Sequence, residues 1–198
     1  MNKKKLAIEL SKLEKFENVK PELEQYPTDS ELAAHILWNA FMQGDIENKI
    51  VADLGCGNGI FGIGALLLGA KLVYFLEVDG EALDVAIKNC KFENVHFRKM
   101  DVLEFDEKVD TVVMNPPFGV QQEHADKNFL EKAMEISDSI YSIHKIESKM
   151  FIEKLSKEND FKVVGIEHKE MILKKTMKFH KSEKYHASVG IWMLKRKL

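Results

Sequence analysis

One stretch of the chain decides its fold: Ile50-Val51-Ala52-Asp53-Leu54-Gly55-Cys56-Gly57-Asn58-Gly59. Its first five residues are apolar apart from Asp53 and predict a buried strand, and an apolar helical pattern begins at about Ile60. The glycines between them let the chain turn sharply and bring its backbone against a ligand. Open α/β sheets bind ligands at the carboxyl ends of their strands, so the stretch predicts both the first strand of such a sheet and a binding site.

Strand-like and helix-like segments alternate along the rest of the chain. The expected strands are 50–54, 72–76, 95–98, 111–114, 139–143, 162–166 and 187–194. The expected helices are 61–68, 81–90, 128–136 and 147–157. Strands separated by helices need crossover connections, which predicts an α/β fold: a mostly parallel seven-stranded sheet with helices on both faces. Weak helical periodicity over 171–186 predicts a loop that returns to an antiparallel C-terminal edge strand.

The first 48 residues precede this alternation. Leu6, Leu10 and Leu13 share one helical face, and Thr28 with Glu31 three residues later predicts a capping box for a helix over 29–42. A chain of 198 residues fits a single α/β domain. We therefore expect one domain, with an N-terminal helical extension over 1–48 and a catalytic core over 49–198.

The composition is that of a folded protein with an uneven charge. Hydrophobic residues make up 45% and charged residues 31%, which argues against disorder. Cys56 and Cys90 have neither CxxC nor metal-ligand spacing, so we expect no metal, no disulfide and a cytoplasmic location. The most apolar stretch, 60–76, is interrupted by glycines and too short to span a bilayer. Residues 169–198 hold nine Lys or Arg against two Glu, which suits either a phosphate-binding surface or a solvated basic tail.

Carboxylates follow the expected strands where a cofactor would lie. Glu77 and Asp79 come about 20 residues after the glycines and are placed to bind ribose hydroxyls, while Asp101-Val102 offers a carboxylate and an apolar wall to adenine. The run from Gly57 to Gly62 also matches the dinucleotide fingerprint GxGxxG, so an NAD site stays open, as does a glycine turn without a ligand. Asp53 favours S-adenosylmethionine, because a carboxylate beside the turn suits a ligand that carries a sulfonium and an amino group.

The tetrapeptide Asn115-Pro116-Pro117-Phe118 follows the fourth expected strand. Proline fixes its own φ and biases the preceding residue toward extended backbone, so Asn115 is held in one pose. The Asn115 amide oxygen and the Pro116 carbonyl can accept the two N–H bonds of an exocyclic amine while Phe118 stacks on its ring. These four residues are therefore candidate catalytic residues. A plain proline turn at a strand end is the alternative.

These motifs resemble the Rossmann-like class I S-adenosylmethionine-dependent methyltransferases that modify planar amino groups. Further segments are similar to the methyltransferase-like protein five family, which makes N6-methyladenosine in small-subunit ribosomal RNA. They are Leu23-Glu24-Gln25-Tyr26-Pro27-Thr28, Asp45-Ile46-Glu47-Asn48-Lys49, Met114-Asn115-Pro116-Pro117-Phe118-Gly119, Tyr141-Ser142-Ile143-His144-Lys145 and Lys178-Phe179-His180-Lys181. The resemblance covers nearly the whole chain.

The resemblance implies how the site is divided. Gln25 and Thr28 would close over S-adenosylmethionine, and the methionine end would meet the glycine loop, with Glu77 at the ribose. With the residues already singled out, the candidate cofactor residues are Gln25, Thr28, Asp53, Gly55, Gly57, Asn58, Gly59, Ile60, Glu77, Asp101, Val102 and Asn115. Two of them depart from the family pattern, because Asn58 stands where it has Cys and Glu77 where it has Asp. The family also implies a small zinc-ribbon activator protein as a partner.

The residues leave the acceptor and the RNA contacts open. Cytosine or guanine amines and a glutamine amide would also suit Asn-Pro-Pro-aromatic, although glutamine methylation usually goes with tyrosine at position 118. A nucleotide- or RNA-binding protein without catalytic activity is the alternative from a different functional class. His144-Lys145 could flank the pocket, or His144 could make a structural hydrogen bond. The segment 121–127 could be a lid or a plain loop. Candidate RNA phosphate contacts are Lys3, Lys4, Lys5, Lys174, Lys175, Lys178 and Lys181.

Overall fold

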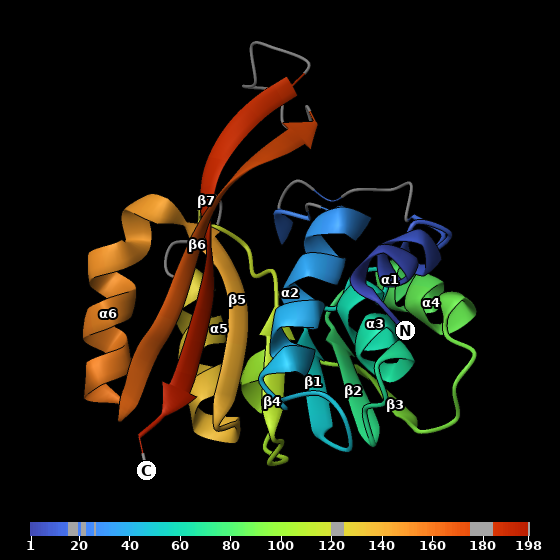
Figure 1. Cartoon of the computed structure of the whole chain (residues 1–198), viewed down its shortest axis with the longest axis horizontal. Helices are drawn as coiled ribbons and strands as arrows, with labels where there is room; N and C mark the ends of the chain where they lie inside the picture. Colours follow the sequence, from blue (N-terminus) through green and yellow to red (C-terminus); the bar gives the residue numbers. More distant parts are fainter. Residues whose placement is uncertain (16–19, 21–22, 26, 120–124, 175–183, 198) are drawn as a thin grey trace.

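The computed structural model describes residues 1–15, 20, 23–25, 27–119, 125–174 and 184–197, with the backbone alone at 171–174 and 184–187 (Figure 1). A seven-stranded sheet in the order β3-β2-β1-β4-β5-β7-β6 forms its centre. Its strands are β1 (Ile50–Leu54), β2 (Leu72–Glu77), β3 (Val95–Lys99), β4 (Thr111–Met114), β5 (Ser139–Lys145), β6 (Phe161–Lys174) and β7 (Lys184–Arg196). The first five strands lie where the sequence predicts them, to within two residues at either end.

The topology confirms a mostly parallel sheet with an antiparallel end. Strands β1 to β5 pair in parallel, whereas β7 pairs antiparallel with both β5 and β6. The C-terminal strand β7 is inserted between β5 and β6, so β6 is the strand at the edge itself. Chain order does not reveal this insertion, because a hairpin can add to a sheet by either of its strands.

Strands β6 and β7 form a hairpin that is longer than the sequence predicts. The expectation of a loop over 171–186 is wrong at both ends, because backbone pairing continues from Met171↔Ala187 to Lys174↔Lys184. Backbone hydrogen bonds between the two hairpin strands stabilise extended structure there, although the side-chain pattern is only weakly periodic. The last β5–β7 pair is Lys145↔Val189, so the outer part of the hairpin is paired only with itself and projects beyond the sheet (Figure 1).

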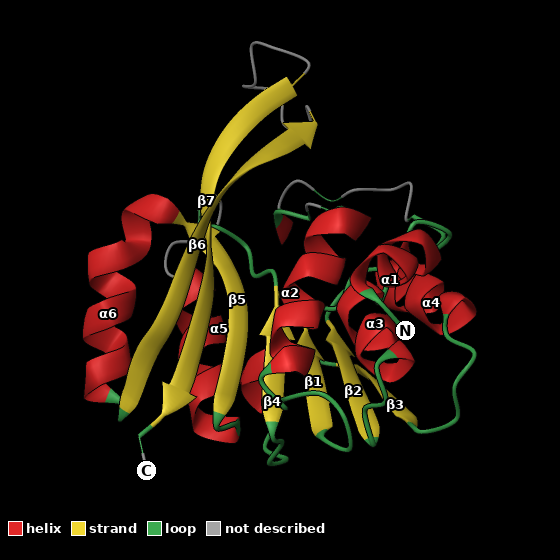
Figure 2. Cartoon of the chain, viewed as in Figure 1, coloured by secondary structure: helices red, strands yellow, loops and turns green. Residues whose placement is uncertain are grey.

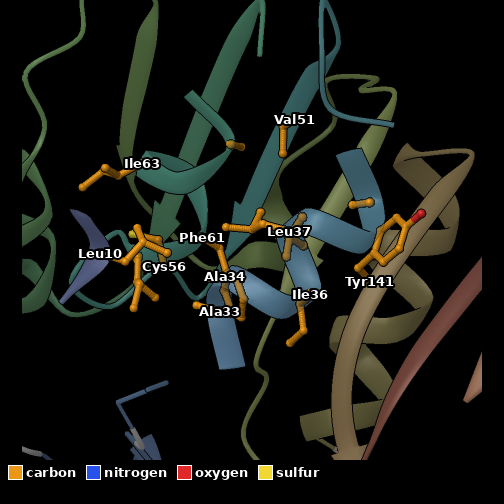
Figure 3. Close-up of a cluster of buried hydrophobic side chains, with 14 of the residues drawn as sticks. Leu10, Ala33, Ala34, Ile36, Leu37, Val51, Cys56, Phe61, Ile63 and Tyr141 are labelled. Carbon is orange, nitrogen blue, oxygen red and sulfur yellow. The ribbon is translucent and has the colours of Figure 1, made fainter. Parts of the chain in front are cut away.

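Helices cover both faces of the sheet, as predicted (Figure 2). One face carries α1 (Lys3–Leu10), α2 (Ser30–Met42), α3 (Ile60–Leu67) and α4 (Gly80–Asn89), and the other carries α5 (Ala125–Ile136) and α6 (Lys149–Glu158). Alternate strand residues divide between the two cores: Val51 packs with α2 and α3 (Figure 3), whereas Ala52 packs on the α5 side. Within the described ranges, no helix has the length and apolar composition that crossing a membrane requires.

The N-terminal helices belong to the core on one face of the sheet. Leu6 is fully buried in the same cluster as α3. Leu10 and Leu37 are fully or almost fully buried in this cluster as well (Figure 3). Helix α2 begins one residue later than a capping box on Thr28 requires, because Asp29 is its N-cap and accepts a hydrogen bond from the Leu32 N–H at 2.9 Å. The Thr28 prediction is therefore wrong by one residue. The boundary between residues 48 and 49 stays a prediction.

A buried polar network ties the chain together at the amino ends of β4 and β5. The Asp45 carboxylate accepts hydrogen bonds from the Tyr141 hydroxyl at 2.5 Å, from Ser139 Oγ at 3.2 Å and from the Lys195 ammonium. Its backbone carbonyl accepts from Thr111 Oγ1 at 2.7 Å. Burial, together with the Asp45 carboxylate, raises the pKa of Tyr141 well above its ordinary value. The network joins the α2–β1 connection to three strands.

Candidate active site

A cavity opens at the carboxyl ends of β1, β2 and β4, where the glycine loop, the acidic segments and the proline turn meet. The described residues of the segment 23–28, which we call the strap, form another wall. The lining residues are Leu23, Glu24, Gln25, Pro27, Thr28, Gly55, Cys56, Gly57, Asn58, Ile60, Phe61, Glu77, Val78, Met100, Asp101, Val102, Asn115, Pro117 and Phe129. Segments separated by up to about a hundred residues of sequence thus share one site.

Most of the predicted site residues lie on this wall. They are Gln25, Thr28, Gly55, Gly57, Asn58, Ile60, Glu77, Asp101, Val102, Asn115 and Pro117. Four predicted residues do not line the cavity: Asp53, Gly59, Pro116 and Phe118. Lining residues that the sequence did not mark as site residues are Leu23, Glu24, Pro27, Cys56, Phe61, Val78, Met100 and Phe129. Most are apolar, and in a sequence an apolar cavity wall looks the same as core.

The glycine loop adopts a backbone that other residues rarely take. Gly55, Gly57 and Gly59 have φ of 69°, 54° and 84°. A Cβ on Gly55 would lie 3.1 Å from the Phe129 ring, so the loop also runs close to α5. Helix α3 then begins at Ile60, which confirms that the turn uses these three glycines and that Gly62 lies inside the helix.

Asp53 supports the loop from behind the cavity. Its Oδ2 accepts a hydrogen bond from the Gly62 N–H at 2.8 Å and so caps α3, whose N-cap Gly59 has no side chain to do this. Its Oδ1 is buried and has no hydrogen-bond partner within the described part of the chain. Burial raises the pKa of Asp53 from 3.8 to about 7. The hydrogen bond from the Gly62 N–H lowers this pKa, and the nearby Glu77 carboxylate raises it.

Glu77 lines the cavity and fixes two loops. Its Oε2 accepts from the Gly57 N–H at 2.9 Å and its Oε1 from the Asp79 N–H at 3.0 Å. Burial raises the pKa of Glu77, although these backbone bonds oppose the rise. The carboxylate is therefore rigidly oriented at the end of β2, where the sequence predicts the ribose acid.

Asp79 fastens the strap to the β2 end of the site. Its carboxylate accepts hydrogen bonds from Lys20 Nζ at 2.6 Å and from Gln25 Nε2 at 2.8 Å, and Gln25 Oε1 accepts from the Lys20 N–H at 2.8 Å. Burial acts to raise the pKa of Asp79, but the bonds from Lys20 and Gln25 outweigh it and lower the pKa below its ordinary value. Gln25 is thus held on the cavity wall, as its predicted role over the cofactor requires.

The predicted cofactor residue Asn58 has a structural contact of its own. Its side-chain amide donates to the Glu14 carbonyl at 3.0 Å, and Asn89 Nδ2 donates to the same carbonyl at 3.0 Å and to the Asn58 carbonyl at 3.0 Å. The polar side chain therefore joins the glycine loop to the segment that precedes the strap, and a cysteine could not make this bond equally well.

The proline turn is fastened to the strap at two points. Asn115 Nδ2 donates to Thr28 Oγ1 at 3.0 Å, which orients the amide on the cavity wall. The Phe118 backbone N–H donates to Glu24 Oε2 at 2.8 Å. The Phe118 side chain is 9% exposed and packs in the core, with Lys145 Nζ 5.9 Å from the centre of its ring. Its role as a stacking face stays a prediction.

His144 makes a structural hydrogen bond, which was one of its two predicted roles. Its Nε2 lies 2.7 Å from Ser142 Oγ, and burial lowers its pKa to about 3, so the ring is neutral at physiological pH. The described residues contain no group of three or more His, Cys, Asp or Glu placed to hold a metal ion. Lys175, Lys178, Lys181 and most of the segment 121–127 lie outside the described residues, as does the side chain of Lys174.

Comparison with known proteins gives this geometry a class. The family model named methyltransferase small domain matches residues 29–140, which contain the glycine loop, Glu77, Asp101 and the proline turn. Fold and site together define an S-adenosylmethionine-dependent methyltransferase. The cofactor is therefore S-adenosylmethionine and not NAD, the other cofactor that the glycine loop allows.

The relatives narrow the class to one family. A solved structure of a candidate RNA methyltransferase from Pyrococcus horikoshii is 46% identical, covers 100% of this chain and 99% of that chain, and superposes with a TM-score of 0.94. An uncharacterized protein of Methanocaldococcus jannaschii is 36% identical over 99% of this chain and 95% of its own. The rRNA N6-adenosine methyltransferase METTL5 of Danio rerio is 36% identical over 92% of this chain and 93% of its own. The chain belongs to the methyltransferase-like protein five (METTL5) family.

Proposed function

We propose that this protein transfers the methyl group of S-adenosylmethionine to the N6 amine of an adenosine in RNA, and that the RNA is small-subunit ribosomal RNA. The observation that carries the proposal is the position of the Asn115 amide, which lies on the same cavity as the glycine loop and Glu77 and is oriented there by Thr28. The relatives from Danio rerio and Drosophila melanogaster are named rRNA N6-adenosine methyltransferases, which supports this acceptor over cytosine, guanine or a glutamine amide.

The residues of the cavity fit S-adenosylmethionine. Gly55 and Gly57 line the cavity at the end of β1, where residues without side chains let a ligand approach the backbone. Glu77 presents an oriented carboxylate to ribose hydroxyls, and Asp101 with Val102 offers an acceptor and an apolar wall to adenine. When bound, the cofactor supplies a methyl group on a positively charged sulfur, which is the electrophile of the reaction.

The protein must activate a weak nucleophile. The lone pair of an adenine N6 amine is delocalised into the ring, so the amine reacts only when it is positioned and repolarised. The Asn115 side-chain oxygen and the Pro116 carbonyl accept hydrogen bonds from the two N–H groups of the amine and draw electron density toward its nitrogen. Positive charge develops on nitrogen during the transfer, and these fixed acceptor dipoles stabilise it. A strong general base is not needed, since the amine becomes acidic as it is methylated.

Phe118 is the proposed stacking partner of the base. Because its side chain is 9% exposed, stacking requires the Phe118 ring to change its side-chain conformation and become exposed while the backbone of the turn stays in place. An unpaired or flipped adenosine would enter at this point, and Lys145, near the ring, lies where it can meet a phosphate. The segment 121–127, which directly follows the turn, is proposed as a lid.

Three parts of the proposal concern the surroundings of the enzyme. The basic C-terminal segment, including Lys174, Lys175, Lys178 and Lys181, would bind RNA phosphates. A small zinc-ribbon activator protein would be the partner, as in the family. We place the reaction in the cytoplasm, as the two unpaired cysteines suggest.

Methyl transfer from radiolabelled S-adenosylmethionine tests the proposal. Purified protein is incubated separately with total RNA, isolated ribosomal subunits and tRNA, with and without a zinc-ribbon activator, and the products are digested to nucleosides. We expect N6-methyladenosine in small-subunit RNA. Label found only in protein, or in another nucleoside, would overturn the acceptor. Calorimetry with S-adenosylmethionine and with NAD tests the cofactor independently of the acceptor.

A further inference from the structure

The strap contains a buried acid that the proposed chemistry does not use. The Glu24 residue is 4% exposed, although it carries a carboxyl group. Its φ is 48°, a left-handed conformation that is unfavourable for residues other than glycine. Burying a charged group is also costly unless it is hydrogen-bonded. Two unfavourable features at one residue indicate that the position of the Glu24 carboxylate has a role in the site.

That carboxylate is directed at the proline turn. Glu24 Oε2 accepts the Phe118 N–H at 2.8 Å, and the bond is buried. Pro116 and Pro117 have no N–H, so the Phe118 N–H is the first backbone donor after Asn115 by which the turn can be held. A charged acceptor makes this bond stronger than a bond between neutral groups.

The strap connects both sides of the site. Gln25 in the strap and Lys20, which precedes the strap, bind the Asp79 carboxylate, and the backbone N–H of Asp79 is bound by Glu77 at the ribose end. At the end of the strap, Thr28 binds the Asn115 amide. Glu24 directly precedes Gln25 in this short segment, which is therefore bound both to the cofactor end of the cavity and to the proline turn that carries the amine acceptors.

We propose that Glu24 is a positioning residue for methyl transfer: its carboxylate holds the proline turn through the Phe118 N–H and so fixes the Asn115 and Pro116 acceptors relative to the methyl donor. This inference rests on the proposed function, because it assigns a role within that reaction. Glu24 also lines the cavity, but in this role it acts through its bond to the turn. The hydrogen bond carries the effect, so a neutral side chain of the same length that keeps an acceptor oxygen preserves it.

Three substitutions at position 24 separate the hydrogen bond from the fold. Glu24→Gln keeps an acceptor oxygen, Glu24→Ala removes it, and Glu24→Gly removes it while relieving the strain of the left-handed backbone. We expect Glu24→Ala and Glu24→Gly to lower kcat about ten- to a hundredfold, because misplacing reacting groups by about 1 Å has effects of that size. Glu24→Gln stays within about threefold of the native kcat. The dissociation constant for S-adenosylmethionine, measured by calorimetry, changes less than about threefold in all three.

Two further measurements separate this role from a merely structural one. Thermal unfolding should rank Glu24→Gly above Glu24→Ala in stability although the two share the same low kcat. Amide hydrogen exchange at Phe118, followed by NMR, should accelerate in both of these variants and not in Glu24→Gln. Glu31→Ala is the matched control, because Glu31 is an exposed acid on the helix that follows the strap.

The outcomes distinguish this inference from the proposed function. If the native protein methylates no adenosine, the proposed function fails, and this inference about that reaction is overturned with it, whatever the exchange at Phe118 shows about the bond. If the native protein is active and Glu24→Ala and Glu24→Gly keep its kcat, the inference is overturned. A kcat for Glu24→Gln as low as that of Glu24→Ala would also overturn it, because then the acceptor oxygen is not what matters.

Discussion

Replacing Asp53 with Asn should remove a pH dependence from the stability of the protein. Asp53 is 1% exposed, one carboxylate oxygen accepts the Gly62 N–H, and the other has no partner within the described part of the chain. Asn has the same shape as a protonated carboxyl group and keeps an oxygen for Gly62, but it does not titrate. The two proteins should therefore be similarly stable when Asp53 is protonated and differ when it is ionised.

The size of the effect follows from the pKa of Asp53, which burial raises from 3.8 to about 7. Between these two pH values the folded protein holds a proton that the unfolded chain has lost, so the free energy of unfolding falls as pH rises. At about 1.36 kcal/mol per pH unit, the loss relative to Asp53→Asn amounts to about 4 kcal/mol near pH 7 and grows no further above it. Below pH 4 the stabilising contribution of the protonated group is fully present.

Urea unfolding of both proteins without cofactor, at pH 4.5, 5.5, 6.5 and 7.5, measures this difference. Other carboxyl groups titrate in both proteins, so their contributions largely cancel in the comparison. We expect the difference between the native and the Asp53→Asn free energies of unfolding to change steadily up to about pH 7 and then to become constant. A difference that does not change over this range would refute a raised pKa and the unpaired oxygen behind it.

Three other substitutions test separate parts of the structure. Asn115→Ala should lower kcat about a hundredfold or more, since it removes an acceptor of the developing charge, while calorimetry shows little change in S-adenosylmethionine affinity. Gly62→Ala should lower the free energy of unfolding by about 1–3 kcal/mol in urea, because its Cβ would lie 2.2 Å from the Phe75 ring. Asp45→Ala should cost about 3 kcal/mol or more in the same assay, because the buried Tyr141 hydroxyl and the Lys195 ammonium lose their acceptor.

Each of these predictions has its own contradicting result. Native turnover by Asn115→Ala would remove this residue from the chemistry. Unchanged stability of Gly62→Ala would mean that α3 and β2 separate without cost. Asp45→Asn, which keeps one oxygen, serves as the control for Asp45→Ala, and equal losses in the two would show that the charge rather than the acceptor matters.

The parallel part of the fold follows from local signals. Strands β1 and β4 are apolar runs that end at Gly55 and Asn115, and crossover helices force such strands to be parallel. Side-chain pattern alone does not fix the order of β6 and β7 in the sheet, because the antiparallel hairpin could add to β5 through either strand. The sequence also does not show that Asp29 rather than Thr28 is the N-cap of α2, since both residues are good N-caps.

The sequence predicts which acids lie at the site, but not which backbone N–H groups these acids bind. Glu77 and Asp101 follow strands in the way a cofactor needs, and both line the cavity. Asp53 has the same kind of position in sequence, yet its partner is the Gly62 N–H. Glu24 gave no signal of its own, because its partner is also a backbone N–H, 94 residues away. Backbone donors are identical at every residue except proline, so sequence cannot show which of them a carboxylate will reach.

The outer part of the β6–β7 hairpin is a spacer whose length is independent of the domain beneath it. Five residues of β6, Glu170 to Lys174, lie beyond the last pair with β5 and are joined only to β7. At about 3.3 Å per residue they extend the ladder by about 17 Å. Removing two residues from each strand would shorten it by about 7 Å and keep every remaining side chain on its own face. The length of the projecting hairpin can therefore be changed two residues at a time while the core and the cavity keep their structure.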